Sequence, residues 1–356
     1  MAEDGRKPRI AVLFGGRSAE HEVSLMSATN VVANIDAATY EVLPVFVARD
    51  GRWLASRAEG GRLTTPDSGT ELCLVAGGRG RMLALEADGT ARETARIDLL
   101  FPVLHGLPGE DGSVQGLAEV AGVPLVGCGL TGSVTAIDKD ITKRLLREAG
   151  IATARSAVIR AAEVPDFTDL RDRLGLPIFI KPARQGSSIG VSKVAGENDY
   201  AEALTAGFRH DRKLLAEEFV DGREIECSVL EDADGELFVS RPGEIASAAS
   251  HGFYSYEAKY VDADGAVLTV PADIPEAIER RIRDTAAEAF RTLGCDAMAR
   301  VDFFLKADGT VLLNEVNTIP GFTDISMYSK AMAASGVSYR EIIDRLVAHG
   351  LARGGG

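Results

Sequence analysis

The sequence predicts an α/β fold divided into roughly two or three domains. Residues 9–14 (RIAVLF) form a continuous apolar run, as in a buried parallel strand, and lead through Gly15-Gly16 into a helical pattern. A second apolar run at 97–104 enters a Gly-rich loop that also precedes a helix. Later segments have the pattern of short strands joined by Asp-Gly turns, which is typical of antiparallel pairs.

The composition of the 356-residue chain excludes several classes of function. It is 46% hydrophobic and 26% charged, with a formal net charge of −14 and no basic patch, so we expect no nucleic-acid partner. No apolar run approaches membrane-spanning length and no signal segment is visible, so we expect a cytoplasmic protein with no membrane partner. The four cysteines are scattered without a C-x-x-C pair, which fits reduced thiols.

The first strand–turn–helix unit places polar residues at the carboxyl end of a strand, where α/β folds bind ligands. His21 and Glu22 fall in a turn before a helix that begins at about residue 24. Glu22 is explained equally well as an acid near a helix N-terminus. The unit lacks G-x-G-x-x-G, so it gives little indication of dinucleotide binding.

The rest of the first layer follows in chain order. A strand is predicted at 40–47. The Gly-rich, irregular residues from about 50 to 96, with short hairpin-like pieces at 71–78 and 82–90, are interpreted as an insertion. His105 ends the strand at 97–104 and enters a Gly-rich loop, which makes it a candidate site residue rather than only a structural histidine. A helix at 113–122 and a strand at 124–128 complete the layer.

Two lysines in the middle of the chain are placed as anion ligands would be. Asp138 can cap a helix closed by Gly150, and Lys139 in its first turn indicates a nearby anion, although a solvated lysine is the alternative. Lys181 ends a strand at 178–181, before a Gly/Ser loop that contains Ser187 and Ser188. Such loops can cover phosphates with backbone N–H groups, but most are only turns, and no P-loop motif is present.

Acidic and aromatic residues follow. A strand at 214–220 carries Glu217 and Glu218, and Glu224 lies just beyond it. Further strands with a turn at Asp234-Gly235 lead to a polar loop rich in aromatic residues at 247–260, whose content is unusual for a solvated loop. A helix from about 275 to 293 precedes the last hairpin.

That hairpin, at 299–317, turns at Asp308-Gly309. If the loop is symmetric about this pair, Asp302 lies opposite Glu315 and Arg300 lies opposite Asn317, with all four side chains on one face. A three-residue loop with a bulge would instead shift the pairing by one residue.

Opposed carboxylates at a Cβ separation of about 5 Å destabilise a bare sheet, whereas a divalent cation makes the arrangement favourable. Carboxylate and amide oxygens are hard ligands that suit Mg²⁺, which usually completes its shell with phosphate and water. Arg300 adds a planar cation for anionic oxygens. The face therefore predicts a metal–phosphate site, and the alternative is a solvated antiparallel face.

Several long motifs carry a resemblance to a known family. They are G-G-R-S-A-E-H-E-V-S at 15–24, H-G-L-P-G-E-D-G at 105–112, K-P-A-R-Q-G-S-S-I-G at 181–190, Y-E-A-K-Y at 256–260, A-R-V-D at 299–302 and N-E-V-N-T-I-P-G-F-T at 314–323. In this order, from about residue 9 to 350, the chain resembles D-alanine–D-alanine ligases of the ATP-grasp superfamily. The resemblance implies a Rossmann-like domain at 1–135, with the insertion, and two α+β subdomains at 136–218 and 219–356 that sandwich ATP.

The resemblance also implies an activity. ATP phosphorylates one D-alanine, the amine of a second attacks the acyl phosphate, and D-alanyl-D-alanine, ADP and phosphate are released for peptidoglycan synthesis. Two Mg²⁺ ions, or Mn²⁺ in their place, and a homodimer are expected. A second substrate of D-lactate or D-serine is the alternative, and Tyr260 favours the dipeptide. A nucleotide-binding regulator without catalysis is another alternative. It would be favoured by the loss of an acidic metal ligand, but Asp302, Glu315 and Asn317 are all present.

Residue roles follow from the resemblance alone. The metal would be bound by Asp302, Glu315 and Asn317, and the oxyanion by Arg300 and the Gly321 N–H. The phosphates would be bound by Lys139, Lys181 and Lys259, and the nucleotide site would be completed by Ser187, Ser188, Glu217, Val220, Glu224 and Asn314. The first D-alanine would be bound by Glu22 and His105 and the second by Ser326, while Ser187 and Tyr260 would hydrogen-bond to Glu22. Two positions depart from the family's pattern, because Ala183 stands where Ser or Thr is common and Glu218 where some members have Lys.

Overall fold

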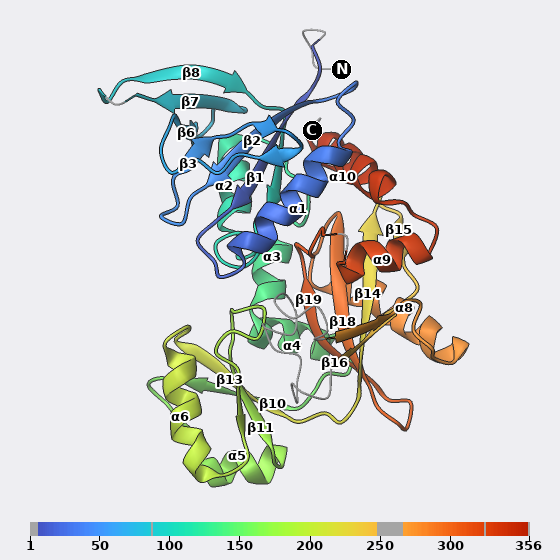
Figure 1. The fold of residues 1–356 in the computed structure, drawn as a ribbon. Coiled ribbons are helices and arrows are strands. Elements are labelled where there is room, and N and C mark those ends of the chain that lie inside the picture. Colours follow the sequence, from blue (N-terminus) through green and yellow to red (C-terminus); the bar gives the residue numbers. More distant parts are fainter. Residues whose placement is uncertain (1–5, 87, 248–265, 324, 355–356) are drawn as a thin grey trace.

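The computed structural model describes residues 6–86, 88–247, 266–323 and 325–354 (Figure 1). It confirms the α/β prediction, with a seven-stranded, a four-stranded and a six-stranded sheet flanked by helices. In Figure 1 the seven-stranded sheet lies at the top, the four-stranded sheet at the lower left and the six-stranded sheet at the right. In the described parts of the chain, no helix has the length and apolar character needed to span a bilayer.

The seven-stranded sheet is built around parallel strands β1 (Arg9–Gly15), β2 (Glu41–Val47) and β9 (Leu99–Val103), with β1 between the other two. All five residues of β9 and six of the seven in β1 are buried, which explains why these runs are apolar without alternation. Helix α1 (His21–Asn34) packs against β1. Helix α2 (Ser113–Ala121) follows β9 as predicted.

The insertion is more regular than predicted, and its predicted hairpin-like pieces at 71–78 and 82–90 are confirmed as antiparallel strands. Strands β3 (Trp53–Ala55), β6 (Glu71–Leu74), β7 (Arg81–Leu85) and β8 (Ala91–Arg96) extend the sheet beyond β2 as antiparallel strands, with β4 (Ala58–Glu59) and β5 (Arg62–Leu63) forming a separate two-stranded ribbon. Alternate side chains of β6 and β7 are buried in the core, a weak period-2 signal that the surrounding glycines obscure in the sequence. The strand predicted at 124–128 is only a single bridge from Leu125 to Leu100.

Helices α3 (Leu130–Ile137) and α4 (Lys139–Glu148) connect to the four-stranded sheet, whose order is β10 (Ser156–Arg160), β13 (Lys213–Glu218), β11 (Ile178–Pro182) and β12 (Ser192–Val194). Its helices are α5 (Phe167–Leu174) and α6 (Glu197–Phe208). The predicted cap is confirmed, because the Asp138 carboxylate accepts hydrogen bonds from the N–H groups of Asp140 and Ile141 at the start of α4.

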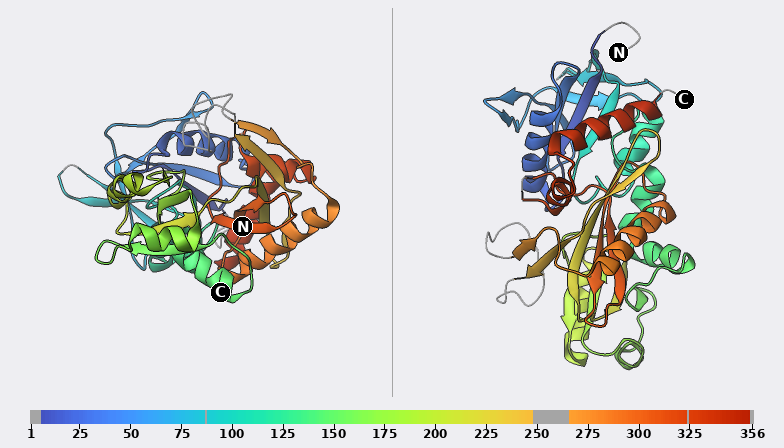
Figure 2. Two further views of the ribbon diagram at one scale, coloured as in Figure 1. Left: turned by 90° about the horizontal axis from the view of Figure 1, so that it is seen from below. Right: turned by 90° about the vertical axis from the view of Figure 1, so that its right-hand side faces the viewer.

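The six-stranded sheet runs β17 (Ala266–Thr269), β16 (Gly243–Ser247), β14 (Arg223–Glu231), β18 (Met298–Leu305) and β19 (Val311–Asn317), with β15 (Leu237–Val239) paired to β14. Helix α8 (Glu276–Thr292) packs on it, and helix α9 (Met327–Ala334) also contacts β14. The last helix, α10 (Tyr339–Arg353), returns to the first sheet (Figure 2). There, Leu346 and Val347 share a core with Ile10 and Phe14.

The register of β18 and β19 decides which side chains face each other. Near the turn, Leu305 faces Val311 and Phe303 faces Leu313, one residue away from the predicted symmetric pairing. A bulge between Asp302 and Phe303 then restores the predicted register. The predicted pairs, Asp302 with Glu315 and Arg300 with Asn317, are therefore confirmed, although the assumption of a symmetric turn is wrong.

Candidate active site

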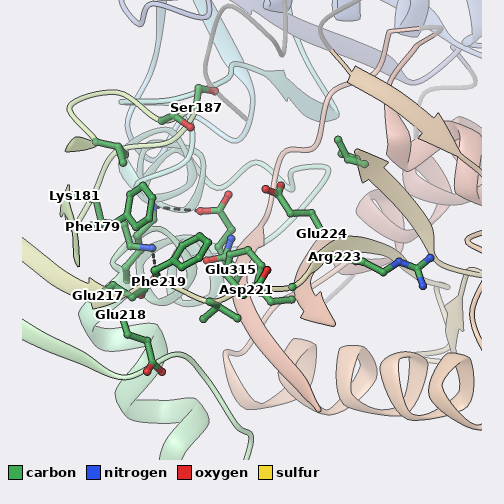
Figure 3. Close-up of a pocket in the computed structure, with 18 of the residues that line it drawn as sticks. Phe179, Lys181, Ser187, Glu217, Glu218, Phe219, Asp221, Arg223, Glu224 and Glu315 are labelled. Carbon is green, nitrogen blue, oxygen red and sulfur yellow. Dashed lines mark hydrogen bonds and ion pairs between the residues drawn. The ribbon is translucent and has the colours of Figure 1, made fainter. Parts of the chain in front are cut away.

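A cavity of about 440 Å³ lies between the four-stranded and six-stranded sheets (Figure 3). This volume is within the range of small-molecule sites. Strands β11 and β13, the Gly/Ser loop and the first turn of α4 line one side, and β14, β16, β18 and β19 line the other. The predicted site residues that line it are Lys139, Lys181, Ser187, Ser188, Glu217, Val220, Glu224, Asn314 and Glu315.

An aromatic pair forms an apolar part of the wall. Figure 3 shows the rings of Phe179 and Phe219 close together, and their centroids are 6.2 Å apart at an interplanar angle of 34°. Phe219 is 49% exposed, and Lys193 Nζ lies 5.9 Å from its ring centroid. Exposed flat rings in a cavity suit a planar ligand group. Sequence reasoning missed this pair, although Phe179 faces Glu217 across the strands and Phe219 lies two residues further on.

A buried ion cluster lies beside the aromatic wall. Glu217 is 4% exposed; its Oε1 accepts a short hydrogen bond from Lys181 Nζ, and its Oε2 lies 2.7 Å from Lys143 Nζ. Burial alone would raise the pKa of Glu217, but the two ammonium groups outweigh it and lower the pKa below its usual value. Sequence reasoning missed Lys143, whose only signal is its position one helical turn after Lys139.

Arg300 lies among acidic side chains on the face of β18. Its guanidinium donates to both oxygens of Asp302, at 2.8 and 2.7 Å, and its Nε is 2.9 Å from Glu226 Oε2. Glu226 faces Asp302 from the neighbouring strand β14. Glu315, across from Asp302 on β19, has its Oε2 3.5 Å from Lys139 Nζ. Glu226 was not predicted, although alternation from Glu224 would place it on the same face.

The oxygen donors on this face fit a hard divalent cation. Asp302 and Glu315 are directly opposed, and Asn317 projects from the same face, with its Oδ1 accepting one hydrogen bond from the Ile319 N–H. Each offers further oxygen lone pairs to a metal. Within the described ranges, no cluster of three or more His, Cys, Asp or Glu could hold a metal on its own. A cation here would therefore also need phosphate or water oxygens, which is the usual coordination of Mg²⁺.

Gly321 and Ser326 approach each other closely after β19. A Cβ atom at position 321 would lie 2.7 Å from Ser326 Oγ, so a larger residue there would displace the Ser326 hydroxyl. Ser326 Oγ accepts a hydrogen bond of 3.0 Å from the Thr323 N–H and lies 2.7 Å from Thr323 Oγ1. The loop thus presents a hydroxyl pair next to a backbone that carries no side chain.

The predicted hydrogen bond between Ser187 and Glu22 is wrong. Glu22 is exposed and forms an ion pair of 3.2 Å with Arg49, whereas Glu20 is 6% exposed and accepts a short hydrogen bond from Ser187 Oγ. Because α1 begins at His21, position 22 in its first turn is directed to solvent while Glu20 precedes the helix. Glu20, and not Glu22, therefore links the first domain to the Gly/Ser loop.

His105 is buried, and both of its ring nitrogens have protein partners. Nδ1 donates to the Ile319 carbonyl at 3.0 Å, so the neutral ring accepts from Ser27 Oγ through Nε2 at 3.1 Å. Ser27 Oγ also accepts from the Phe322 N–H at 3.2 Å. Burial lowers the pKa of His105, which keeps the ring neutral. His105 thus holds residues 319–322 in place, and its contact with the first D-alanine stays a prediction.

Glu110 is a buried acid of the H-G-L-P-G-E-D-G motif that sequence reasoning left unassigned. It accepts a hydrogen bond of 2.6 Å from the Gly106 N–H. Burial, with a smaller contribution from the nearby carboxylate of Glu20, raises the pKa of Glu110 to about 8. Lys259 and Tyr260 lie outside the described residues, with the rest of the 256–260 motif.

Comparisons with known proteins show which proteins the chain is similar to. A family model described as the D-ala D-ala ligase N-terminus matches residues 9–128, and one described as the D-ala D-ala ligase C-terminus matches residues 145–348. The chain is 64% identical over 348 residues to D-alanine–D-alanine ligase A of Brucella suis, covering 98% of this chain and 99% of that one. It is 46% identical to D-alanine–D-alanine ligase B of Bradyrhizobium diazoefficiens, covering 99% and 96%.

Solved structures give the same result. The VanG D-Ala:D-Ser ligase from Enterococcus faecalis superposes with a TM-score of 0.84 at 34% identity, covering 97% of this chain and 99% of that one. The D-alanine–D-alanine ligase from Coxiella burnetii superposes with a TM-score of 0.83 at 33% identity, covering 98% and 95%. Since both family models match and these relatives span nearly the whole sequence, the chain belongs to the D-alanine–D-alanine ligase family.

Proposed function

We propose that the protein joins two D-alanine molecules to D-alanyl-D-alanine in an ATP-dependent reaction that releases ADP and phosphate. The observation that carries the proposal is the opposed pair Asp302 and Glu315, of which Glu315 lines the same cavity as Lys139 and Lys181. A carboxylate is a poor acylating group, so transfer of the γ-phosphoryl group to it creates the leaving group that the second amine displaces. Such a reaction needs positioning and charge neutralisation more than covalent help from the protein.

In this proposal, ATP lies between the two smaller sheets in an ATP-grasp arrangement. Residues 1–135 form a Rossmann-like substrate domain, and residues 136–218 and 219–356 form the subdomains that enclose the nucleotide. The cavity between these sheets supports the arrangement. The assembly is a cytoplasmic homodimer that supplies a peptidoglycan precursor.

Asp302, Glu315 and Asn317 would hold two Mg²⁺ ions, or Mn²⁺ in their place. The donor set is one that Mg²⁺ prefers when phosphate oxygens complete its coordination. When bound, these ions would neutralise phosphate charge and withdraw electron density from the transferred group. Arg300, held by Asp302 and Glu226, is fixed in orientation before any ligand binds.

The remaining cavity residues would bind the nucleotide. Lys139 and Lys181, with Lys259, would contact the phosphates beneath the Ser187 and Ser188 backbone. The base would lie against Phe179 and Phe219, with further contacts from Glu217, the Val220 backbone, Glu224 and Asn314, all of which line the cavity.

The amino-acid substrates would lie between this cavity and the first sheet. Glu20, which accepts a hydrogen bond from Ser187, would bind the ammonium group of the first D-alanine. Tyr260 would also hydrogen-bond to this acid. Arg300 and the Gly321 N–H would stabilise the oxyanion of the tetrahedral intermediate. Ser326 would bind the carboxylate of the second D-alanine, and His105 would position the 319–322 loop that carries Gly321.

Phosphate release from ATP, measured with D-alanine, L-alanine or no amino acid, tests the proposal. We expect release only with D-alanine, together with formation of the dipeptide. Since one similar solved structure is titled a D-Ala:D-Ser ligase, products should also be analysed with competing D-serine and D-lactate across pH. A mixed dipeptide or ester as the main product would establish the alternative second substrate. Phosphate release without any amino acid would exclude both the D-alanine ligase function and this alternative.

The Glu20 assignment predicts different effects for two neighbouring acids. Glu20→Gln should raise the KM for the first D-alanine by about 10–100-fold, because a charge-assisted hydrogen bond contributes about 1.5–3 kcal/mol. Glu22→Gln should change it by less than about twofold, since the Glu22 ion pair is exposed. Initial rates at saturating ATP measure both values, and the reverse ranking would restore the original assignment.

Ser326→Ala should raise the requirement for the second D-alanine by about tenfold, the effect of losing one hydrogen bond of about 1.4 kcal/mol. The KM for ATP should not change. The variant also removes the oxygen that accepts from the Thr323 N–H, so thermal unfolding serves as the control for loop structure. An unchanged requirement for the second D-alanine would remove Ser326 from that pocket.

A further inference from the structure

Lys143 is a buried cation that the roles above do not use. Its side chain is 2% exposed, and its Nζ lies 2.7 Å from Glu217 Oε2 and 3.3 Å from the Ala154 carbonyl. It stands four residues after Lys139 on α4, so both project from the same face of the helix. In the described part of the chain, Lys139 lines the cavity and Lys143 does not. Lys143 therefore contacts the site through Glu217.

Glu217 divides its two oxygens between two lysines. Oε1 accepts from Lys181, which lines the cavity, and Oε2 pairs with Lys143 behind it. The cluster of one carboxylate and two ammonium groups has a net charge of +1. One net positive charge therefore remains in the cluster, beside the cavity that Lys181 lines, because Lys143 also neutralises the carboxylate.

We infer that Lys143 is a positioning residue that neutralises and orients Glu217, so that the charge of Lys181 remains available to the phosphates of the nucleotide. This inference rests on the proposed function, since it takes the ligand to be ATP. It gives a physical reason for a buried lysine near a nucleotide cavity. Removing one partner of a buried ion pair leaves a costly unbalanced charge, and the remaining cation must then compensate for it.

The consequence is a non-additive effect of two substitutions. In Lys143→Met the Glu217 carboxylate keeps Lys181 as its sole counter-ion in this cluster, and phosphate must compete for that charge. In Lys143→Met/Glu217→Gln no carboxylate remains to compete, while the amide oxygen introduced at position 217 can still accept a hydrogen bond. The second substitution should therefore restore part of what the first removes, whereas two independent losses of packing would accumulate.

Calorimetric binding of ADP with Mg²⁺ to wild type, Lys143→Met, Glu217→Gln and the double variant tests this inference. We expect Lys143→Met to weaken ADP binding at least tenfold and the double variant to bind at least threefold more tightly than Lys143→Met. Should Lys143→Met not fold, the double variant is compared with Glu217→Gln, and the two should agree within threefold. A double variant that binds no more tightly than Lys143→Met, or more than threefold more weakly than Glu217→Gln, would overturn the inference.

Arg345→Met is the matched control, because it breaks a part-buried ion pair of 2.6 Å between α10 and Asp232, and neither residue lines the described cavity. It should lower thermal stability and leave ADP binding unchanged. In Lys143→Met the KM for ATP should rise at least tenfold and the KM for D-alanine less than threefold; equal increases would also overturn the inference. A wild-type protein that binds ADP without forming the dipeptide would contradict the proposed function alone.

Discussion

Glu315→Gln is expected to reduce ATP-dependent phosphate release by about a thousandfold, equivalent to about 4 kcal/mol of transition-state stabilisation. Glu315 faces Asp302 across the β-ladder, and glutamine replaces its anionic oxygens with one neutral oxygen and an NH₂ group that cannot bind a cation. Lys139, 3.5 Å from Glu315 Oε2, would also lose its counter-ion. Single-turnover phosphate release at saturating Mg²⁺ and ATP measures the effect.

The variant should stay folded, because relieving the repulsion between opposed carboxylates does not destabilise a sheet. Glu288→Gln is the matched control, since Glu288 is exposed on α8, and it should retain wild-type activity. Near-normal turnover of Glu315→Gln would overturn the assignment of this face as a metal–phosphate site.

Arg300→Lys is expected to lower kcat by about 10²–10³-fold, the usual effect of removing one oxyanion donor. The guanidinium contacts Asp302 and Glu226 simultaneously through Nε and Nη2, which fixes its plane. Lysine keeps the positive charge but has neither the planar fork nor the same reach. The KM for ATP should rise less than tenfold, because the substitution weakens stabilisation of the intermediate more than binding of the substrates.

A paired measurement separates catalysis from folding in this variant. Pre-steady-state rates give the chemical step, and thermal unfolding reports the cost of leaving Glu226 with a weaker partner. A kcat within threefold of wild type, with stability reduced, would show that Arg300 serves only the fold.

The central pairing could be predicted from sequence because side-chain alternation and an Asp-Gly turn constrain a hairpin strongly. The actual turn shifts the register by one residue, and the bulge after Asp302 cancels that shift. Alternation alone cannot reveal two compensating irregularities. Similarly, the E-H-E sequence offers two acids, and only the position at which α1 begins decides that Glu20 is turned inward.

Other features depend on contacts between distant segments, which local patterns do not carry. The strands of the 50–96 insertion are short and flanked by glycines, so their pairing with β2 is set by the sheet that they extend. In the sequence, Lys143 has the pattern of an ordinary helical lysine. Its role depends on Glu217, which belongs to another element and lies 2.7 Å away in the fold. The ring contacts of His105 likewise join residues more than 200 positions apart.

The most direct test is a crystal structure with ADP and Mn²⁺, in which anomalous scattering locates the metal. The account predicts a peak between the nucleotide phosphates and the oxygens of Asp302, Glu315 and Asn317, at distances of about 2 Å. Bound ADP with no anomalous peak on this face of β18 and β19, or with its phosphates directed away from it, would contradict the account.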